Sequence, residues 1–508
     1  MSIFYRTKKR TYLSISWKKY LMLTNIIFDA IITTEQFLPP DPKGIFQLMI
    51  SRSDIKADFE RIASHLRRWL SSPLAYALIF ILATAITWFN IEVEGAIFFV
   101  FIVALYMVTF DDLISAMLPF LLTCTFTLKC YDSFDTFMAH KWVAIPAIFA
   151  VVFHFVYYRK KFSIGDSFSG VCTVAVAVTL GGLFSISAED YFREISLYYV
   201  FALGIGMILG YLVVRASLDG RPIAESSERF AVFMYLWGAF AMYMIYQFVL
   251  VNWSVMLETG ELPHFQWSNN VATVLMFALP FPFYFSLKNP SHLVPGYLMY
   301  IALLLSTSRG GILFGTAEII IITVYVIFAA QKQTTRFIAI GTAVAAFAVL
   351  YKNLLGLADI LNISSITAPE GLISSDEPRV ILLKRSIEDF KSNIFFGRGL
   401  GYTGNTDAYD PKKGSLYFYH MMIPQIIGSM GLCGVVGYFW QFALRIRTII
   451  RRITPYTLCL FISYLGIFMM SQVNPGEFVP LPYSLISVTL FIIMEKQPIA
   501  SEMDTEIR

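Results

Sequence analysis

The chain has 508 residues and a formal net charge of +4, with 57% hydrophobic and 15% charged residues. Soluble domains carry about 25% charged residues, so this composition excludes a soluble protein with an ordinary polar surface. Apolar runs of about 20 residues recur along the chain, and each is long enough to cross a bilayer. Because these runs are unbroken rather than alternating, they favour helices over a membrane barrel. We therefore predict an all-α, polytopic membrane helical bundle.

The N-terminal segment, residues 1–72, is mixed and basic. Its basic cluster from Arg6 to Arg10 is not followed by the short apolar core and small-residue cleavage site of a signal peptide. We predict that this segment lies in the cytoplasm or on the membrane surface, and its pattern does not indicate a task.

About fourteen segments are predicted to cross the membrane. They form a bundle over residues 73–354 and a C-terminal group over 417–495, which are separated by one long polar loop, 355–416, and followed by a tail, 496–508. The segments are 73–91, 94–110, 112–130, 139–157, 167–187, 196–214, 230–252, 270–287, 292–308, 311–330, 336–354, 417–441, 456–473 and 478–495.

The placement of Lys and Arg predicts the orientation, because loops on the cytoplasmic side carry an excess of cations. With the N-terminus inside, the inside loops carry Arg159, Lys160, Lys161, Arg215, Arg221, Arg229, Lys332, Arg336, Arg445, Arg447, Arg451, Arg452 and Lys496. The loop 355–416 then lies outside the cytoplasm. A loop of this length is uncommon unless it is functional.

Metal chemistry has no support in the sequence. The five cysteines show neither zinc spacing nor a CxxC pair, and we interpret them as small core residues. No pair of Asp or Glu residues has the character of a metal site. We predict no metal, no cofactor and no nucleic-acid partner.

The first candidate residue is Arg309, in the segment Ser306-Thr307-Ser308-Arg309-Gly310-Gly311 at the outer end of a predicted span. A charge at this position is often an interfacial anchor. Against that reading, cations are expected in excess inside, whereas this one lies outside. The hydroxyl residues and the Gly-Gly pair also suit a small anion-binding turn.

The second candidate is Arg379, in the outer loop. Asp376 is a plausible helix cap and Pro378 a plausible first residue, and apolar positions at Val380, Leu383, Ile387 and Phe390 define one face of an amphipathic helix on the membrane or on the bundle. Arg379 begins this helix beside free backbone amides, a favourable setting for phosphate. The alternative is a solvated surface arginine.

A glycine turn follows this helix. Gly397, Gly399 and Gly401 alternate with other residues, including Arg398, and make a backbone that could approach a ligand closely. The turn is therefore a candidate substrate loop. The pattern is not a nucleotide signature, because no strand precedes it, and a plain flexible turn is the alternative.

The third candidate is His420, at the outer start of the predicted span 417–441. Its imidazole can take a proton near neutral pH, although a lone histidine beside aromatic residues is often structural. The structural interpretation also applies to His140, His154, His264 and His292. Glu318 is an intramembrane carboxylate, so it is either functional or hydrogen bonded to a neighbouring helix.

Two arginines and one histidine on the outer side suit one reaction, the transfer of a sugar from a polyprenyl pyrophosphate. Cations must stabilise the charge on the departing pyrophosphate, which arginine does through paired hydrogen bonds. A base should remove the proton from the attacking hydroxyl. Arg309, Arg379 and His420 could supply these groups without a metal.

At these residues the sequence resembles the superfamily of O-antigen ligases and O-antigen polymerases, which are bacterial membrane glycosyltransferases. The resemblance covers roughly residues 265–445, from Ser268-Asn269-Asn270 through Thr307-Ser308-Arg309-Gly310, then from Arg379 to the glycine turn, and finally from His420 to a Gly-rich stretch. Met421, Ile394 and Leu383 stand where the family often has Asn, Pro and Trp.

The resemblance implies a GT-C-like, metal-independent fold in the bacterial cytoplasmic membrane with its active site on the extracytoplasmic face. It implies an inverting transfer from undecaprenyl-pyrophosphate-linked glycan to a glycan or lipid-linked glycan acceptor. Arg309 and Arg379 would bind the pyrophosphate and His420 would activate the acceptor. A flippase and a chain-length regulator are possible partners.

Four hypotheses follow. The leading one is a polymerase of lipid-linked repeat units of O-antigen, capsule or exopolysaccharide, and the second is a ligase that moves glycan to lipid A core, a wall polymer or a protein. A transporter or flippase of an anionic lipid-linked glycan would have its arginines along a path through the bundle. A non-catalytic scaffold would tolerate substitution of His420.

Overall fold

The computed structural model describes residues 57–130, 139–184, 197, 200–218, 222–260, 262–265, 267–345, 378–400, 419–474 and 481–499. By its internal contacts the chain divides into two units, residues 1–66 and 67–508. In the first unit the described residues, 57–66, are helical. The second unit carries the helical bundle.

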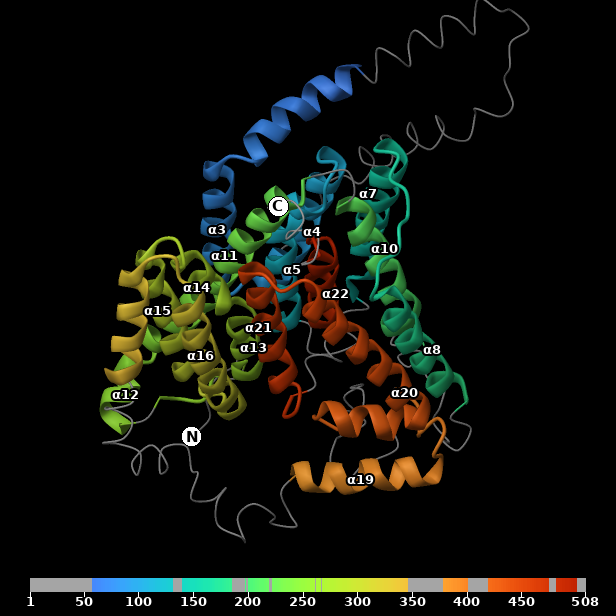
Figure 1. The fold of residues 1–508 in the computed structure, drawn as a ribbon. Helices are drawn as coiled ribbons and strands as arrows, with labels where there is room; N and C mark the ends of the chain where they lie inside the picture. Colours follow the sequence, from blue (N-terminus) through green and yellow to red (C-terminus); the bar gives the residue numbers. More distant parts are fainter. Residues whose placement is uncertain are drawn as a thin grey trace, which may run out of the picture. The chain divides into compact units, whose positions relative to one another are not determined.

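The described residues of the second unit contain helices and no strand, which confirms the all-α prediction (Figure 1). A helix over 333–345 completes the following set. The others are α3 (Pro73–Trp88), α4 (Glu92–Thr109), α5 (Met117–Cys130), α7 (Ala144–Tyr157), α8 (Phe168–Phe184), α10 (Met207–Leu218), α11 (Ile223–Val251), α12 (Trp253–Thr259), α13 (Ser268–Ala278), α14 (Pro280–Ser286), α15 (Leu293–Leu305), α16 (Arg309–Ala329), α19 (Pro378–Ser392), α20 (Met422–Arg451), α21 (Pro455–Met470) and α22 (Leu481–Glu495).

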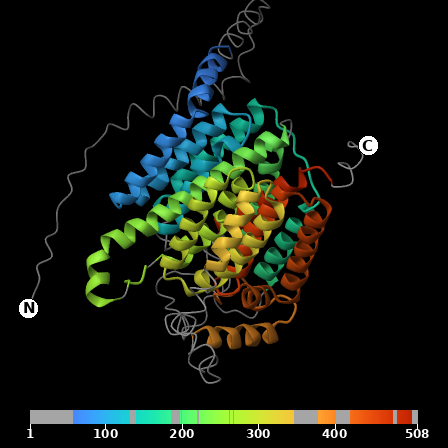
Figure 2. The same cartoon turned by 60° about the vertical axis from the view of Figure 1, so that its left-hand side comes forward.

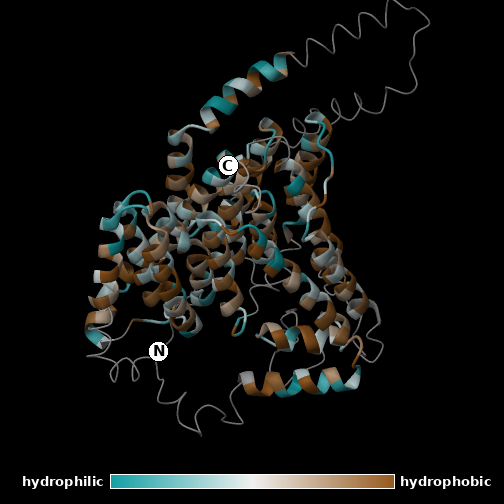
Figure 3. Ribbon diagram, viewed as in Figure 1, coloured by the Kyte–Doolittle hydropathy of each residue, from teal (hydrophilic) through white to brown (hydrophobic). Residues whose placement is uncertain are grey.

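The surface of these helices suits a lipid environment. Apolar residues dominate most helices in Figure 3, and large apolar side chains such as Phe328, Val436 and Phe439 are exposed. Exposed apolar area of this extent disfavours a protein in water. Within the described ranges, four helices are long and apolar enough to cross a membrane by length and composition, namely α4, α11, α16 and α20. The total of about fourteen spans stays a prediction.

One end of the bundle, which we call the Arg309 end, gathers the starts of three helices. Ser308, the residue before α16, donates its hydroxyl to Asn269 in the first turn of α13 at 2.7 Å. The backbone N–H of Met422, the first residue of α20, donates to the carbonyl of Ser471, just after α21, at 2.9 Å. The starts of α13, α16 and α20 and the end of α21 therefore meet here.

Two ion pairs lie at the opposite end. Arg215, near the end of α10, lies 2.7 Å from a carboxylate oxygen of Glu495 at the end of α22, and the Tyr211 hydroxyl donates to the same oxygen at 3.0 Å. Arg452, just after α20, pairs with Asp166 before α8 at 3.2 Å. These two arginines belong to the loops that the sequence predicts to be cytoplasmic, and they lie at the end away from Arg309.

Helices α8 and α20 pack closely because small residues separate their backbones. A Cβ atom added to Gly437 would lie 2.9 Å from the Thr173 carbonyl oxygen, and one added to Gly170 would lie 2.9 Å from the Gln441 Cα. Small residues allow this approach in membrane helices. The pair α8 and α20 therefore forms one rigid side of the bundle.

Helix α20 is broken at Gly431, whose φ of 57° and ψ of −146° are not helical. The residues after α19 dock into this break. The N–H groups of Arg398 and Gly399 donate to the carbonyls of Gly428 and Ser429 at 2.8 and 3.0 Å. In return, the N–H groups of Leu432 and Cys433 donate to the carbonyls of Ile394 and Phe395 at 2.8 and 3.1 Å. Four backbone hydrogen bonds thus replace those that the break removes from α20.

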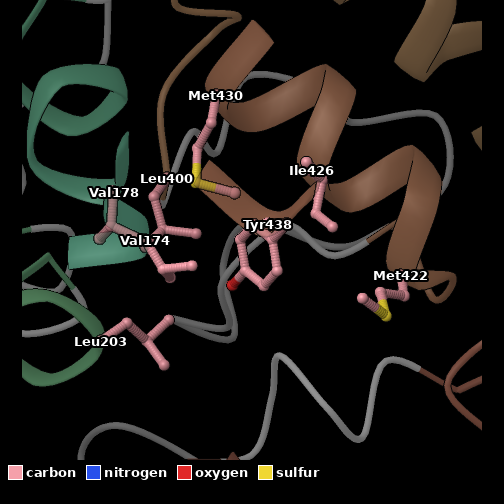
Figure 4. Packing of buried hydrophobic residues seen from close by; sticks show 8 residues of the cluster. All are labelled: Val174, Val178, Leu203, Leu400, Met422, Ile426, Met430 and Tyr438. Atoms are coloured by element: carbon pink, nitrogen blue, oxygen red, sulfur yellow. The ribbon is translucent and has the colours of Figure 1, made fainter. Parts of the chain in front are cut away.

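Because of this break, the first part of α20 lies along α19 in both views (Figures 1 and 2). Apolar packing holds the docked segment in place. Leu400 is buried against Val174 and Val178 of α8 and against Ile426 and Met430 of α20 (Figure 4). The turn after α19 is therefore part of the core, and it sets the direction in which α20 starts.

The break predicts a strong requirement for glycine at position 431. In Gly431→Ala, the added Cβ would lie 2.5 Å from the Ile394 carbonyl oxygen, and the backbone would occupy a region that is essentially restricted to glycine. We expect the free energy of unfolding to fall by at least about 2 kcal/mol. Thermal unfolding in detergent measures the change.

Gly341→Ala is the matched control, because a Cβ at Gly341 meets no heavy atom within 4 Å. Alanine favours a helix over glycine by about 1 kcal/mol, so this variant should melt at or above the temperature of the parent. Equal melting of the two variants would show that the break does not constrain the fold.

Candidate functional site

Arg309 is the first residue of α16, and its side chain is exposed. Thr307 precedes it with a positive φ of 60°, and Ser308 caps the helix by accepting the N–H of Gly311 at 3.1 Å. The guanidinium therefore stands at a helix start, where free N–H groups and the helix dipole favour an anion.

The Gly-Gly pair after Arg309 was expected to open a turn, but both glycines lie within the first turn of α16. They allow neighbouring helices to approach. A Cβ at Gly311 would lie 2.6 Å from the Cβ of Ala272 in α13, and one at Gly310 would lie 2.6 Å from Val473 just after α21. The pair therefore fixes where Arg309 stands relative to α13 and α21.

His420 directly precedes α20, as the sequence predicts, and is half-buried. Its φ of 53° lies in the left-handed region, which is uncommon for residues other than glycine. Hydrogen bonds fix the backbone before and after His420. Tyr419 donates its N–H to the Gln425 side chain at 3.0 Å, and Met422 donates to the Ser471 carbonyl. The backbone around His420 is thus determined by α20 and α21.

Arg309 and His420 approach the same segment, the end of α21. Gly310, next to Arg309, lies against Met470 and Val473, while Met422, two residues after His420, bonds to Ser471. Residues next to both candidates therefore contact the same segment, residues 470–473, at the Arg309 end.

Arg379 lies in the first turn of α19, and its side chain and Asp376 lie outside the described residues. Asp389 is ten residues further on, which corresponds to about 15 Å along the helix. The convergence of the Arg379 side chain with the other two candidates stays a prediction.

The amphipathic helix exists, and Leu382, Ser386 and Asp389 are its buried residues. Leu383 and Ile387 belong to the apolar face that was predicted to lie on the membrane or on the bundle, and they are exposed, so these two residues do not pack on the bundle. The reason is electrostatic: the buried carboxylate of Asp389 must keep its polar partners, and these partners lie on the bundle.

Asp389 anchors α19 to the residue before His420. It is 1% exposed, and it accepts the Tyr419 hydroxyl at 2.5 Å. Arg385 and Arg398 lie 3.3 and 3.4 Å from its other oxygen. Burial raises the pKa of Asp389 above its ordinary value, while the hydrogen bond from Tyr419 and the two guanidinium groups oppose this shift.

The glycine turn also has a clear neighbour. Gly397 and Gly399 have positive φ values of 66° and 99°. The N–H of Gly399 donates to the Ser429 carbonyl at 3.0 Å, and a Cβ added to Gly397 would lie 2.5 Å from the Gly428 carbonyl oxygen, so the turn packs against the backbone of α20. Arg398 pairs with Asp389. The close backbone approach that the sequence indicated therefore occurs toward α20, and a role of this turn toward substrate stays a prediction.

Asp389 and Tyr419 were not among the candidates from the sequence. Arg385 and Asp389 are four residues apart, so they lie on one face of the helix and could have indicated an ion pair. Nothing in the sequence indicated Tyr419 as the partner, because 30 residues separate it from Asp389.

Two buried titratable side chains, His154 and Glu318, differ in their hydrogen-bond partners. His154 is buried, and its ring nitrogens lie 2.9 Å from the Met107 carbonyl and 3.2 Å from the Ser217 hydroxyl, which fits the structural interpretation. Glu318 is fully buried against Gly466 of α21, and neither of its oxygens has a hydrogen-bond partner in the described part of the chain. The predicted hydrogen bond to a neighbouring helix is absent there.

With this geometry in place, comparison with known proteins gives one match. Residues 296–439 match the O-antigen ligase family. The match confirms the resemblance to the superfamily of O-antigen ligases and polymerases, whose members are glycosyltransferase-type enzymes. No curated protein and no solved structure matches the chain.

The matched O-antigen ligase segment contains Arg309, α19, the glycine turn and His420. It supports an activity of the ligase or polymerase type, lipid-linked glycan substrates and a bacterial membrane location in general terms. Asn269 and α21, which hold the Arg309 turn, lie outside the segment. Among the described residues, no group of three or more His, Cys, Asp or Glu side chains could hold a metal.

The hydrogen bond between Tyr419 and Asp389 predicts that Tyr419→Phe destabilises the protein. The variant removes the hydroxyl that donates to the buried carboxylate, so we expect the free energy of unfolding to fall by about 1–3 kcal/mol. Chemical denaturation in detergent measures it. Tyr246→Phe is the control, because that hydroxyl donates to the Leu298 carbonyl at an exposed position. A Tyr419→Phe protein as stable as the control variant would contradict the anchor.

Proposed function

We propose that the chain transfers glycan from an undecaprenyl-pyrophosphate carrier to a hydroxyl acceptor on the extracytoplasmic face of the bacterial cytoplasmic membrane. The observation that carries the proposal is the meeting of the Arg309 turn and the His420 turn at the end of α21. The family match over residues 296–439 supports the same class of chemistry.

The reaction would proceed as an inverting substitution. The bond between the anomeric carbon and the pyrophosphate oxygen breaks, and the pyrophosphate leaves with the bonding electrons. Arg309 and Arg379 would stabilise its growing charge. The acceptor hydroxyl oxygen forms the new bond to the anomeric carbon, and His420 would take its proton.

We propose further that the acceptor is another lipid-linked glycan, so that the enzyme polymerises repeat units of a surface polysaccharide. A flippase would supply those units at the outer face, and a chain-length regulator would limit the product. Transfer to lipid A core, a wall polymer or a protein is the second candidate, which the description of the matched family favours.

Substitution of the three residues tests the chemistry. Arg309→Ala, Arg379→Ala and His420→Ala should each lower the transfer rate by at least about 100-fold, because each removes a group that acts mainly in the transition state. The transfer rate of Arg309→Lys should lie between those of the parent and of Arg309→Ala, because lysine keeps the charge and loses the paired donors. Surface glycan and carrier-linked intermediates are measured in cells at equal expression.

Lys332→Ala is the matched control, because this exposed lysine lies in a loop predicted to be cytoplasmic. It should leave the glycan unchanged. Transfer at the normal rate in all of the alanine variants would exclude the proposed reaction.

The intermediates that accumulate after deletion separate the two acceptors. A polymerase mutant should accumulate single repeat units on the carrier, because the units cannot be joined. A ligase mutant should accumulate long carrier-linked chains, because polymerisation continues without release. Mass spectrometry of the extracted carrier lipids reads the difference, and long chains would overturn the polymerase assignment.

A further inference from the structure

A pocket of about 340 Å³ opens near the Arg309 end, and its lining contains none of the residues assigned above. Its lining is aromatic and polar together. The residues used below come from the end of α3, the end of α5, the later part of α11 and the segment before α13, and they are Thr87, Trp88, Lys129, Gln247, Phe248 and Phe265. This volume lies at the lower end of the range for small-molecule sites.

The wall of this pocket contains Thr87, whose hydroxyl is buried. The residue is 4% exposed, and its Oγ1 has no hydrogen-bond partner among the described residues. Thr84, one turn earlier in α3, instead donates its hydroxyl to the Ile81 carbonyl at 2.7 Å, which is the usual arrangement in a helix. A buried hydroxyl without a partner costs free energy, so its retention at the pocket wall points to a ligand that bonds with it.

The charge of the pocket argues for a neutral ligand. Lys129 is the cation in the lining, and it forms an ion pair with Glu92 at the start of α4. The Gln247 amide adds a donor and an acceptor without charge. A phosphate would need an uncompensated cation or several donors, whereas a polyol can bond to an amide and a hydroxyl.

The aromatic part of the lining completes the match to a sugar. The rings of Phe248 and Phe265 lie 4.8 Å apart between centroids, and Trp88 contributes a third ring to the wall. A pyranose ring presents C–H groups on its faces and hydroxyls around its edge. Apolar walls with a few placed polar groups therefore recognise both parts of it.

Phe265 connects the pocket to the candidate site. While its side chain lines the pocket, its backbone N–H donates to the Thr307 hydroxyl at 3.3 Å, two residues before Arg309. The Trp267 indole ties the same segment to the end of α5 by donating to the Leu128 carbonyl at 3.0 Å. A ligand in the pocket would thus lie beside the turn that carries Arg309.

We propose that this pocket binds a neutral sugar unit of the donor glycan, an assignment that rests on the proposed function. The pocket adjoins the Arg309 turn, so a glycan whose pyrophosphate lies at Arg309 would place one of its sugars here. The pocket then selects the donor by the shape and hydroxyl pattern of that sugar.

Binding of a free oligosaccharide tests this assignment without any transfer reaction. The ligand is the repeat-unit oligosaccharide released by mild acid from the carrier-linked intermediates of the host. Its dissociation constant is measured with the full chain in detergent, by the change in tryptophan fluorescence and by saturation-transfer NMR. We expect binding to the parent protein, and Thr87→Val with Gln247→Leu should weaken it by at least about tenfold, since two hydrogen bonds are lost.

Stability separates this effect from misfolding. Thr87→Val replaces a hydroxyl that has no partner in the described ranges by a methyl group of similar size, so its melting temperature should equal or exceed that of the parent. Thr84→Val, in the same helix, is the matched control, and it should bind the oligosaccharide like the parent.

Three outcomes would overturn the assignment: no binding by the parent at millimolar oligosaccharide, equal binding by the double variant, or displacement of the oligosaccharide by inorganic pyrophosphate. Arg309→Ala distinguishes this test from that of the proposed function, because it should abolish transfer and leave oligosaccharide binding intact. Transfer that survives in the Arg309, Arg379 and His420 variants would contradict the proposed reaction. It would leave the measured binding of the oligosaccharide unaffected.

Discussion

The exchange of backbone hydrogen bonds between the glycine turn and α20 is the constraint on which the site depends. A helix broken within a bundle leaves N–H and C=O groups unpaired, and in lipid each unpaired group costs several kcal/mol. Here the segment 394–399 satisfies both sides of the break at Gly431. The break can therefore persist, and α20 can start in a direction that no straight helix would allow.

That direction determines where His420 stands. The first part of α20 runs beside α19, and Tyr419 is held between the Asp389 carboxylate and the Gly428 backbone. At the other side, Ser471 holds Met422. The histidine thus sits on a backbone that three separate elements determine, while the loop containing α19 is fastened to the bundle by the same contacts.

The arginines differ in how their charges are placed. Arg215 and Arg452 at the opposite end, and Arg385 and Arg398 beside Asp389, are paired with carboxylates, so their charges hold segments together. The guanidinium of Arg309 is instead exposed at a helix start. An exposed cation beside free backbone amides attracts an anion, and the neighbouring neutral pocket suits the uncharged part of the same molecule. This division matches a substrate that joins a pyrophosphate to a glycan.

The sequence by itself determined the all-helical class and the approximate positions of most of the described helices, because apolar length is a local property. It also placed His420 at a helix start, whereas it placed Arg309 at the end of the preceding span and not at the start of α16. Tertiary structure alone decided which face of α19 is buried, since a partner 30 residues away, Tyr419, holds Asp389 there. It also decided that the glycine turn fills the break in α20 and that Thr87 lines a pocket with a hydroxyl that has no partner among the described residues, because both depend on contacts between segments far apart in the chain.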